Sequence, residues 1–391
     1  MTPLNPARQT VQADEYWMEQ ALALARTALY VTAPNPRVGC LIVRDGVVLG
    51  RGATQAAGQA HAEVMALSDA RRQGHDPGGA TVYVTLEPCS HHGRTPPCVN
   101  ALIQARPARV VIAMNDPNPA VSGQGAVRLH DAGIEVASGI LAEQALAVNP
   151  GFVARMVRGT PWVWLKLAAS MDGYIALPDG ESKWITGTAA RADGHHWRAR
   201  SCVVLTGLGT IMADDPLLNV RGISTPRQPV RAIVDTRFEI SETVRVLDGG
   251  SVWIFTGHDD PAKRQRLADR GVQVIVLPVL HHRVDLGSMM QWMASRDVNE
   301  VHVEAGSRLS GALLDAGLAD ELLLYMAPAM LGQGIPMAQI NPLTSLAHAQ
   351  RFEFTDTATL GSDVRLCLRH PQHWHQLCRS VGIDAPAPVQ S

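Results

Sequence analysis

A histidine and two cysteines in the first quarter of the chain have the residue types and the order of a zinc site. His61-Ala62-Glu63 is followed by Pro88-Cys89 and then by Pro97-Cys98. One imidazole and two thiolates can hold Zn²⁺ and leave its fourth position open for water. The metal lowers the pKa of that water, which makes hydroxide available near neutral pH. Spacing alone allows Glu63 as a fourth ligand, but its natural role is to carry a proton from attacking water to a departing amine, as in zinc nucleobase deaminases.

The spacing of the two cysteines departs from the general deaminase signature. That signature is Pro-Cys-x-x-Cys, whereas eight residues separate Cys89 from Cys98. The long spacing disfavours a cytidine or tRNA adenosine deaminase. A structural zinc module stays open as an alternative, because His91 or His92 could supply the fourth protein ligand that closes such a site.

The residues around these ligands predict an α/β domain. Asp45-Gly46 lies between two apolar runs, 40–43 and 47–49, and indicates a hairpin. A helix is expected over 15–30, and Pro34-Asn35-Pro36 stops it. Helices then alternate with strands; the helices begin at about 61 and about 97, span 125–132 and run up to 149, and the strands lie at 81–86, 108–114 and 134–137. This order predicts a three-layer α/β domain with site loops at the strand ends.

The composition favours a soluble globular protein. The 391 residues suggest two domains, and 34 basic against 36 acidic residues give a net charge of −2. Without a basic arm, electrostatic binding to nucleic acid is not favoured, and no apolar run reaches the roughly 18 residues of a membrane span. Six cysteines without disulfide spacing suit a reducing compartment, and residues 1–15 lack the order of a signal peptide. We therefore expect a cytoplasmic protein with a small-molecule substrate; the sequence leaves a homo-oligomer open.

A transition between two turn-forming stretches predicts a domain boundary near residue 158. Two turn-forming stretches, 149–151 and 158–161, bracket it, so we expect domains at 1–158 and 159–370 and a C-terminal tail at 371–391. Residues 385–388 alternate alanine and proline, which is typical of a frayed terminus. The second half again alternates helices and strands; the helices lie at 187–199, at 261–269 and from about 307, and the strands at 162–168, 202–206, 230–234, 252–255, 272–277, 300–303, 321–327 and 363–368.

Two Pro-rich loops could complete the zinc pocket. Asn35 is held between two prolines, and Asp116 opens the stretch Asp116-Pro117-Asn118-Pro119 after a strand. A restrained backbone loses less freedom when a ligand binds. On their own, both loops are more simply explained as ordinary turns. His91, His92 and Arg94 could face a phosphate or lie in solvent.

The motifs of the first half together resemble one family, the bifunctional riboflavin-biosynthesis deaminase/reductases. The resemblance rests on Pro34-Asn35-Pro36-x-Val38-Gly39, His61-Ala62-Glu63, the run from Leu86-Glu87-Pro88-Cys89 to Pro96-Pro97-Cys98, and Asp116-Pro117-Asn118-Pro119. The long cysteine spacing is that family's own. The resemblance implies a cytidine-deaminase-like α/β/α domain with one zinc on His61, Cys89 and Cys98, and Glu63 as proton shuttle. It further implies Asn35 and Asp116 near a diaminopyrimidinone that carries a phosphoribosylamino group.

Taken without the resemblance, the second half carries weaker signals. The dinucleotide fingerprint G-x-G-x-x-G is absent, because Met212 stands where a third glycine would follow Gly207-Leu208-Gly209. The turn Glu304-Ala305-Gly306-Ser307 ends a strand and opens a helix, and its free N–H groups would suit a phosphate, although a plain turn explains it as well. Lys166 interrupts an apolar strand, where a lysine most often lies on a solvated face.

Two arginines are candidates for a substrate phosphate. Arg198 falls in an expected helix, and Arg221 follows the segment Asp214-Asp215-Pro216. A guanidinium can bind a phosphate through two parallel hydrogen bonds.

The second half resembles the reductase domain of the same family, which is similar to dihydrofolate reductase in fold. The resemblance rests on Lys166-Leu167-Ala168-x-Ser170-x-Asp172-Gly173, Ser182-x-Trp184-Ile185-Thr186-Gly187, Asp214-Asp215-Pro216 and Glu304-x-Gly306. It implies hydride transfer from NADPH that opens the ribose to a ribityl chain. The implied cofactor contacts are Ala168, Trp184, Thr210, Asp214, Thr236, Gly306, Ser307, Arg308, Leu309, Ser310, Gly311 and Ala312. The implied substrate contacts are Ser182, Arg198, Leu218, Arg221 and Glu304.

Two other functions remain as alternatives to a bifunctional enzyme. One is a zinc nucleobase or nucleoside deaminase whose C-terminal domain is not catalytic. The other is a nucleic-acid binding or editing protein, which the near-neutral charge and the lack of a basic, aromatic strip disfavour.

Overall fold

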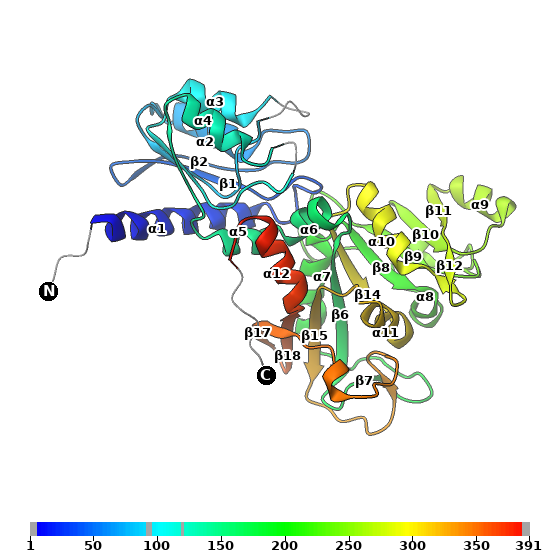
Figure 1. Cartoon of the computed structure of the whole chain (residues 1–391). Helices are drawn as coiled ribbons and strands as arrows, with labels where there is room; N and C mark the ends of the chain where they lie inside the picture. The colour runs from blue at the N-terminus through cyan, green and yellow to red at the C-terminus, as the bar shows by residue number, and fades with distance from the viewer. Residues whose placement is uncertain (1–5, 91–95, 119–120, 385–391) are drawn as a thin grey trace. The chain divides into compact units, whose positions relative to one another are not determined.

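The computed structural model describes residues 6–90, 96–118 and 121–384, and the chain divides into two compact units. The first unit comprises residues 1–158 together with 375–391, and the second comprises 159–374. Figure 1 shows their elements along the chain. The prediction of a frayed end at 385–388 lies outside the described residues.

The first unit is built on a five-stranded sheet in the order β2-β1-β3-β4-β5. Strand β1 is antiparallel to β2 and β3, whereas β3, β4 and β5 are mutually parallel. Asp45 and Gly46 both have positive φ, 52° and 75°, as a tight hairpin turn between β1 and β2 requires. The strands are β1 Gly39–Arg44, β2 Val47–Ala53, β3 Thr81–Val84, β4 Arg109–Ile112 and β5 Glu135–Ser138.

Helices cover both faces of this sheet, which makes the three layers that the sequence predicts. Helix α1 packs on one face and α2 on the other, because the glycines of the hairpin admit each backbone closely. A Cβ on Gly52 would lie 2.3 Å from the carbonyl oxygen of Ala62, so only glycine lets α2 approach β2 beside His61 and Glu63. The helices are α1 Pro6–Thr27, α2 Ala62–Arg72, α3 Cys98–Ala105, α4 Gln124–Asp131, α5 Ala142–Val148 and α6 Pro150–Arg158.

The second unit is built on a nine-stranded sheet in the order β11-β10-β9-β8-β14-β6-β15-β18-β17. The seven strands from β11 to β15 are parallel, and β18 and β17 complete the sheet as an antiparallel edge. The strands of the sheet are β6 Trp162–Ser170, β8 Val203–Gly207, β9 Val230–Val234, β10 Val252–Thr256, β11 Val272–Val276, β14 Glu300–Glu304, β15 Glu321–Ala327, β17 Glu353–Leu360 and β18 Asp363–Arg369. Short strands outside it are β7 Tyr174–Ala176, β12 Val279–Leu280, β13 Arg283–Val284 and β16 Ile335–Pro336.

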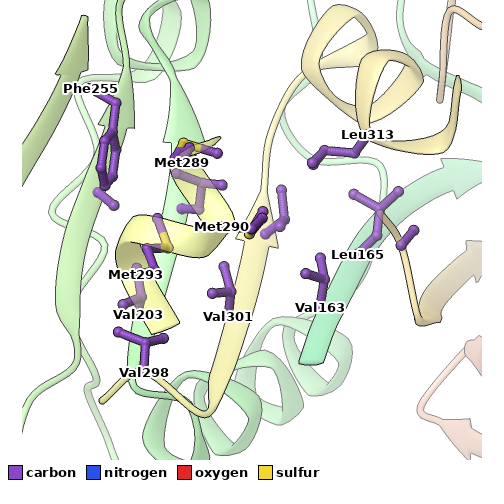
Figure 2. Packing of buried hydrophobic residues seen from close by; sticks show 14 of the residues in the cluster. Val163, Leu165, Val203, Phe255, Met289, Met290, Met293, Val298, Val301 and Leu313 are labelled. Carbon is purple, nitrogen blue, oxygen red and sulfur yellow. The ribbon is translucent and has the colours of Figure 1, made fainter. Parts of the chain in front are cut away.

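One face of the nine-stranded sheet is an apolar core and the other carries the polar residues of a site. On the apolar face, three methionines of α10 and Leu313 of α11 pack on valines and leucines of β6, β8 and β14 (Figure 2). On the other face, Trp197 of α7 lies 4.8 Å from Trp164, between ring centroids. The helices are α7 Thr188–Arg200, α8 Leu208–Asp214, α9 Pro261–Ala268, α10 Leu286–Ser295 and α11 Ser307–Asp315, with 3₁₀ turns at Arg245–Leu247 and Leu346–His348. Helix α12 Pro371–Ser380 begins in the second unit, and its residues from 375 onward belong to the first.

The structure differs from the sequence prediction mainly in elements that the prediction lacks. Helices α6, α8 and α10 and the exposed edge strand β17 were not predicted, and β17 takes the edge position that the sequence predicts for 363–368. The segment expected as a tail from 371 begins with α12. This helix places Trp374 and Leu377 three residues apart on one buried stripe, and Trp374 packs against Trp162 with ring centroids 6.2 Å apart. Among the described residues, no helix is both long enough and apolar enough to cross a bilayer.

Candidate functional site

The three predicted metal ligands converge at one end of the first sheet. His61 is the N-cap of α2, Cys98 is the first residue of α3, and Cys89 lies in the loop that joins β3 to α3. His61 Nδ1 is 3.7 Å from Cys89 Sγ and 3.3 Å from Cys98 Sγ. In the described part of the chain these three side chains form one donor group, with all ligand atoms within 4.8 Å of one another.

The geometry of this group fits a tetrahedral zinc ion. Zn–S and Zn–N bonds of roughly 2.3 and 2.0 Å at a tetrahedral angle place N and S about 3.5 Å apart, and the two observed distances bracket that value. The backbone N–H of Cys98 donates to Cys89 Sγ at 3.2 Å. Hydrogen bonds from Cys98, and then from His61, lower the pKa of the Cys89 thiol well below its usual range. The thiolate form that zinc requires is therefore favoured at this sulfur.

Glu63 lies in the first turn of α2, two residues beyond His61, and its side chain contacts Cys98. The residue is 4% exposed, and burial together with the charge of Cys89 raises the pKa of its carboxyl to about 7. A dication beside it would lower that pKa again. A buried carboxyl with a pKa near the working pH can both accept and return a proton.

The two predicted substrate loops lie at the same edge of the sheet. Cys40 pairs with Val84, so the segment that enters β1, including Asn35, reaches the edge where β3 ends. The N–H of Asn35 donates to the carbonyl of Thr32 at 2.9 Å. Asp116 follows β4 and is 7% exposed, and burial raises the pKa of its carboxyl to about 7. His91, His92 and Arg94 lie outside the described residues.

In the second unit, the end of β14 carries a buried ion pair. Glu304 accepts hydrogen bonds from Arg198 Nε and Nη2, the second at 2.8 Å, while Arg198 Nη1 donates to the carbonyl of Asn219 at 2.9 Å. Although burial opposes it, the Arg198 guanidinium holds the pKa of Glu304 well below its usual range. His302, on the same face of β14 and fully buried, places Nε2 3.3 Å from Glu304 Oε1. The carboxylate is therefore fixed in place at the carboxyl end of the parallel strands.

Lys166 belongs to this cluster and not to a solvated face. It pairs with Glu304 across β6 and β14 and with Leu323 across β6 and β15, so its side chain is on the face that α7 covers. Its Nζ is 5.7 Å from the ring centroid of Tyr325. The residue is partly buried, and burial lowers the pKa of its ammonium. The sequence favoured a solvated face for Lys166, because alternation along a strand does not tell which face a helix covers.

A positively charged group continues from Arg198. The Arg221 N–H donates to His195 Nδ1 at 3.2 Å, and Arg221 Nη1 donates to Asn219 Oδ1 at 2.6 Å. Desolvation, and then the charges of Arg198 and Arg221, lower the pKa of His195. Leu218, whose φ is 52°, is 2% exposed and lies directly before Asn219. The arrangement gathers positive charge that an anion would offset.

Several of the predicted cofactor residues are neighbours at the turn between β14 and α11. A Cβ on Gly306 would lie 3.8 Å from Thr210 Oγ1, so the start of α11 faces α8. Ser307 is 7% exposed, and its hydroxyl has no hydrogen-bond partner among the described residues. Arg308, Leu309, Ser310, Gly311 and Ala312 form the following turns of α11. The free N–H groups at the start of α11 are available to a phosphate.

The loop that holds Ser182 and Trp184 is tied to α8. Lys183 Nζ is 3.0 Å from Asp214 Oδ1, and the Arg191 guanidinium lies 4.3 Å from the Trp184 ring centroid. Ala168 is on β6, two residues beyond Lys166 on the same face. Thr236 instead follows β9, and its hydroxyl accepts the N–H of Val284 at 3.3 Å.

Comparison with known proteins gives one family match in each of the two units. Residues 11–114 match the family described as the cytidine and deoxycytidylate deaminase zinc-binding region, and residues 161–366 match the RibD C-terminal domain. Two relatives named riboflavin biosynthesis protein RibD are similar along nearly the whole chain. The one from Escherichia coli K12 is 43% identical over 91% of this chain and 99% of its own length, and that from Haemophilus influenzae is 42% identical over 90% and 96%.

Solved structures agree with these relatives. Acinetobacter baumannii RibD has a TM-score of 0.84 at 44% identity and covers 92% of this chain and 99% of its own. A diaminohydroxyphosphoribosylaminopyrimidine deaminase/5-amino-6-(5-phosphoribosylamino)uracil reductase from Thermotoga maritima has a TM-score of 0.83 at 32% identity, with 92% and 99% covered. These matches confirm the predicted division into a deaminase half with a zinc-binding region and a reductase half. The chain therefore belongs to the RibD family of bifunctional riboflavin-biosynthesis enzymes, in which a zinc-dependent deaminase domain is joined to a reductase domain.

Proposed function

We propose that the chain catalyses two consecutive steps on one small molecule. Residues 1–158 replace the 2-amino group of 2,5-diamino-6-(phosphoribosylamino)pyrimidin-4-one by the oxygen of water, and residues 159–370 reduce the ribosyl group of the product to a ribityl chain. The observation that carries the proposal is the metal-ligand triad beside buried Glu63 in one unit, together with the Lys166–Glu304–Arg198 cluster in the other. The chain's cytoplasmic location belongs to the same proposal.

In the deaminase, the chain's own groups move the proton and hold the ring. Zn²⁺ on His61, Cys89 and Cys98 supplies an acidified water when it is bound. Glu63 takes the proton from the attacking water and passes it to the amine that leaves the ring as ammonia. Asp116 and Asn35, at the same sheet edge, pair with the polar edge of the ring. Because Asp116 titrates near neutrality, its protonated carboxyl can donate to a ring nitrogen or carbonyl.

In the reductase, a side chain must supply the proton that the ribose ring oxygen needs after hydride transfer. NADPH, when bound, supplies the hydride that forms the new C–H bond at C1′ of the ribose. The bond from C1′ to the ring oxygen breaks, and that oxygen needs a proton. Lys166 is the group that we assign to donate it, since burial makes its ammonium a stronger acid than an exposed lysine. Glu304 holds Arg198 and faces the sugar hydroxyls, and Ser182 and Leu218 line the substrate side.

The cofactor lies, in this proposal, against the turn between β14 and α11. Gly306, Ser307 and the following N–H groups of α11 face a phosphate. Thr210, Asp214 and Trp184 border the same space, with Ala168 beneath it; the role of Thr236 follows from the resemblance alone.

Mass spectrometry of the products tests both steps. Incubated with the diaminopyrimidinone alone, the enzyme should raise the substrate mass by about one unit, because an amino group becomes a carbonyl oxygen. With NADPH present, a further gain of about two units should follow. Prior treatment with a zinc chelator should abolish the first change and leave the second intact when the deaminated compound is supplied. A chelated enzyme that still deaminates, or an active one that never oxidises NADPH, would contradict the proposal.

A second prediction concerns the substrate phosphate. The N–H groups of Arg198 donate to Glu304 and to the carbonyl of Asn219. We therefore assign the phosphate mainly to Arg221, which is exposed. Replacing Arg221 by alanine should lower the reductase kcat/KM by about tenfold, through loss of a charge-assisted hydrogen bond. The loss should vanish with a dephosphorylated substrate. The control variant Arg237→Ala, at an exposed position, should leave kcat/KM unchanged with both substrates. An equal loss with both substrates would contradict the assignment.

A further inference from the structure

Glu87 is a buried carboxylate that no step of the chemistry uses. It lies between β3 and the metal ligand Cys89, and it is 2% exposed. Its N–H donates to the carbonyl of Met114 at 2.9 Å, which aligns it with the strand that leads to Asp116. A buried charge of this kind is stable only when its oxygens are well supplied with donors.

Four backbone N–H groups supply those donors. Oε2 accepts from Asp116 at 3.2 Å and from Gly123 at 2.9 Å. Oε1 accepts from Gly125 at 2.9 Å and from Ala126 at 3.3 Å. The donors come from the start of the Asp116 loop and from the entry and first turn of α4. One side chain therefore connects three segments: the Cys89 loop, the Asp116 loop and α4.

The approach of α4 to this carboxylate leaves no spare room. A Cβ on Gly125 would lie 2.2 Å from the carbonyl oxygen of Pro88 and 3.0 Å from Glu87 Oε1. A second tether lies beyond Cys89, where Arg128 of α4 donates to the carbonyl of Ser90 at 2.8 Å and to Asn100 Oδ1 at 2.7 Å. Helix α4 is thus hydrogen-bonded to the Glu87 side chain before Cys89 and to the Ser90 carbonyl after it.

We propose that Glu87 is a positioning residue for deamination. It fixes the loop of Asp116 relative to the backbone of Cys89, so that the ring-binding carboxyl and the metal site keep one spacing. The proposal rests on the assignment of Asp116 as a substrate contact. Because all four partners are donors, only a group with two acceptor oxygens satisfies them.

The isosteric variant Glu87→Gln tests this in the full-length enzyme. Its NH₂ group would replace one acceptor and face two backbone N–H groups, which would leave both donors unpaired. We expect deaminase kcat/KM to fall by about ten- to hundredfold, as a small displacement of a binding group can cause. The fall should reside mainly in KM, with one zinc per chain and an unchanged reductase rate on the deaminated compound.

Asp69→Asn is the matched control. Asp69 is also a buried carboxylate of the first unit, and it accepts the Arg51 N–H at 3.0 Å and Gln73 Nε2 at 2.9 Å, away from the Asp116 loop. This variant should lower the melting temperature, because it removes a buried hydrogen-bond acceptor. It should leave the deaminase KM within about twofold of the parent value, because it does not move the Asp116 loop. A purely structural role for Glu87 would make the two variants behave alike.

Three results would overturn the proposal. One is Glu87→Gln with an unchanged KM and full zinc. Another is loss of zinc from that variant, since Glu87 would then serve the metal site itself. If Glu87→Gln does not fold, Gly125→Ala, which pushes α4 away from the same carboxylate, must raise KM instead, and an unchanged KM there is the third. An inactive parent enzyme would count against the deaminase assignment and not against this role of Glu87.

Discussion

Replacing Glu63 by glutamine is expected to lower the rate of deamination by about 10²–10⁴-fold, the range that a positioned proton-transfer group contributes. Glutamine keeps the shape of the side chain in the first turn of α2 but cannot take the proton of the attacking water. The deaminated product would then form only slowly even with substrate bound. Ammonia release under saturating substrate, followed over time, measures the effect.

The same variant should retain its metal, because His61, Cys89 and Cys98 are untouched and Glu63 is not a ligand in this assignment. Zinc content near one per chain separates loss of proton transfer from loss of the site. The reductase rate on the deaminated compound reports on the other unit of the same chain, and exposed Glu143→Gln is a matched substitution away from the site. Ammonia release within tenfold of the parent rate would rule out Glu63 as the proton carrier.

The metal site was predictable because its ligands lie in short sequence motifs whose residue types are typical of zinc sites. His61 and Glu63 are two residues apart at a helix start, and each cysteine follows a proline, Cys89 in the loop after β3 and Cys98 at the start of α3. Sequence order alone places such residues near the carboxyl ends of neighbouring strands. The triad geometry could be expected from residue type, since zinc accepts few donor sets.

Other parts depended on packing that no local pattern reveals. Alternation placed Lys166 on one face of β6 together with Trp164 and Ala168, but it did not tell that α7 would cover that face. Helices α10 and α12 were missed because each is only ten residues long and its apolar stripe is correspondingly short, although Asp285 caps α10 and Pro371 opens α12. In the sequence, Glu87 is only one residue of the motif Leu86-Glu87-Pro88-Cys89. The folded backbone shows that four N–H groups donate to its side chain.

The two sites also differ in how they are assembled. The deaminase ligands come from residues 61–98, whereas the reductase cluster draws on residues 166, 198, 221 and 304. Parallel strands joined by helices bring distant residues to one edge, so spacing along the chain carries little information about such a site. The resemblance to a family was therefore needed to name the reductase residues, while the deaminase ligands could be argued from their own chemistry.

Lys166→Met is expected to lower the reductase kcat by about 10²–10⁴-fold, because methionine fills the same space but cannot protonate the ribose ring oxygen as the bond to C1′ breaks. Cofactor affinity should change little, since most of the assigned NADPH contacts lie on α8, α11 and the Trp184 loop, and Ala168, the assigned contact on β6, is unchanged. NADPH oxidation with saturating deaminated substrate measures the rate, and deamination by the same variant should be unaffected.

The pH dependence identifies the lysine more specifically than the rate does. The donor must be protonated to act, and burial lowers the pKa of Lys166 below that of an exposed lysine. In the parent enzyme, kcat should therefore be full at low pH and fall as pH rises through that lowered pKa, before ordinary lysines titrate. This alkaline limb should be missing from Lys166→Met and present in Lys263→Met, whose Nζ instead donates to the Phe238 carbonyl at 2.6 Å. An unaltered limb in Lys166→Met would assign the proton to another donor, and His302, fully buried beside Glu304, is the nearest candidate on the same face.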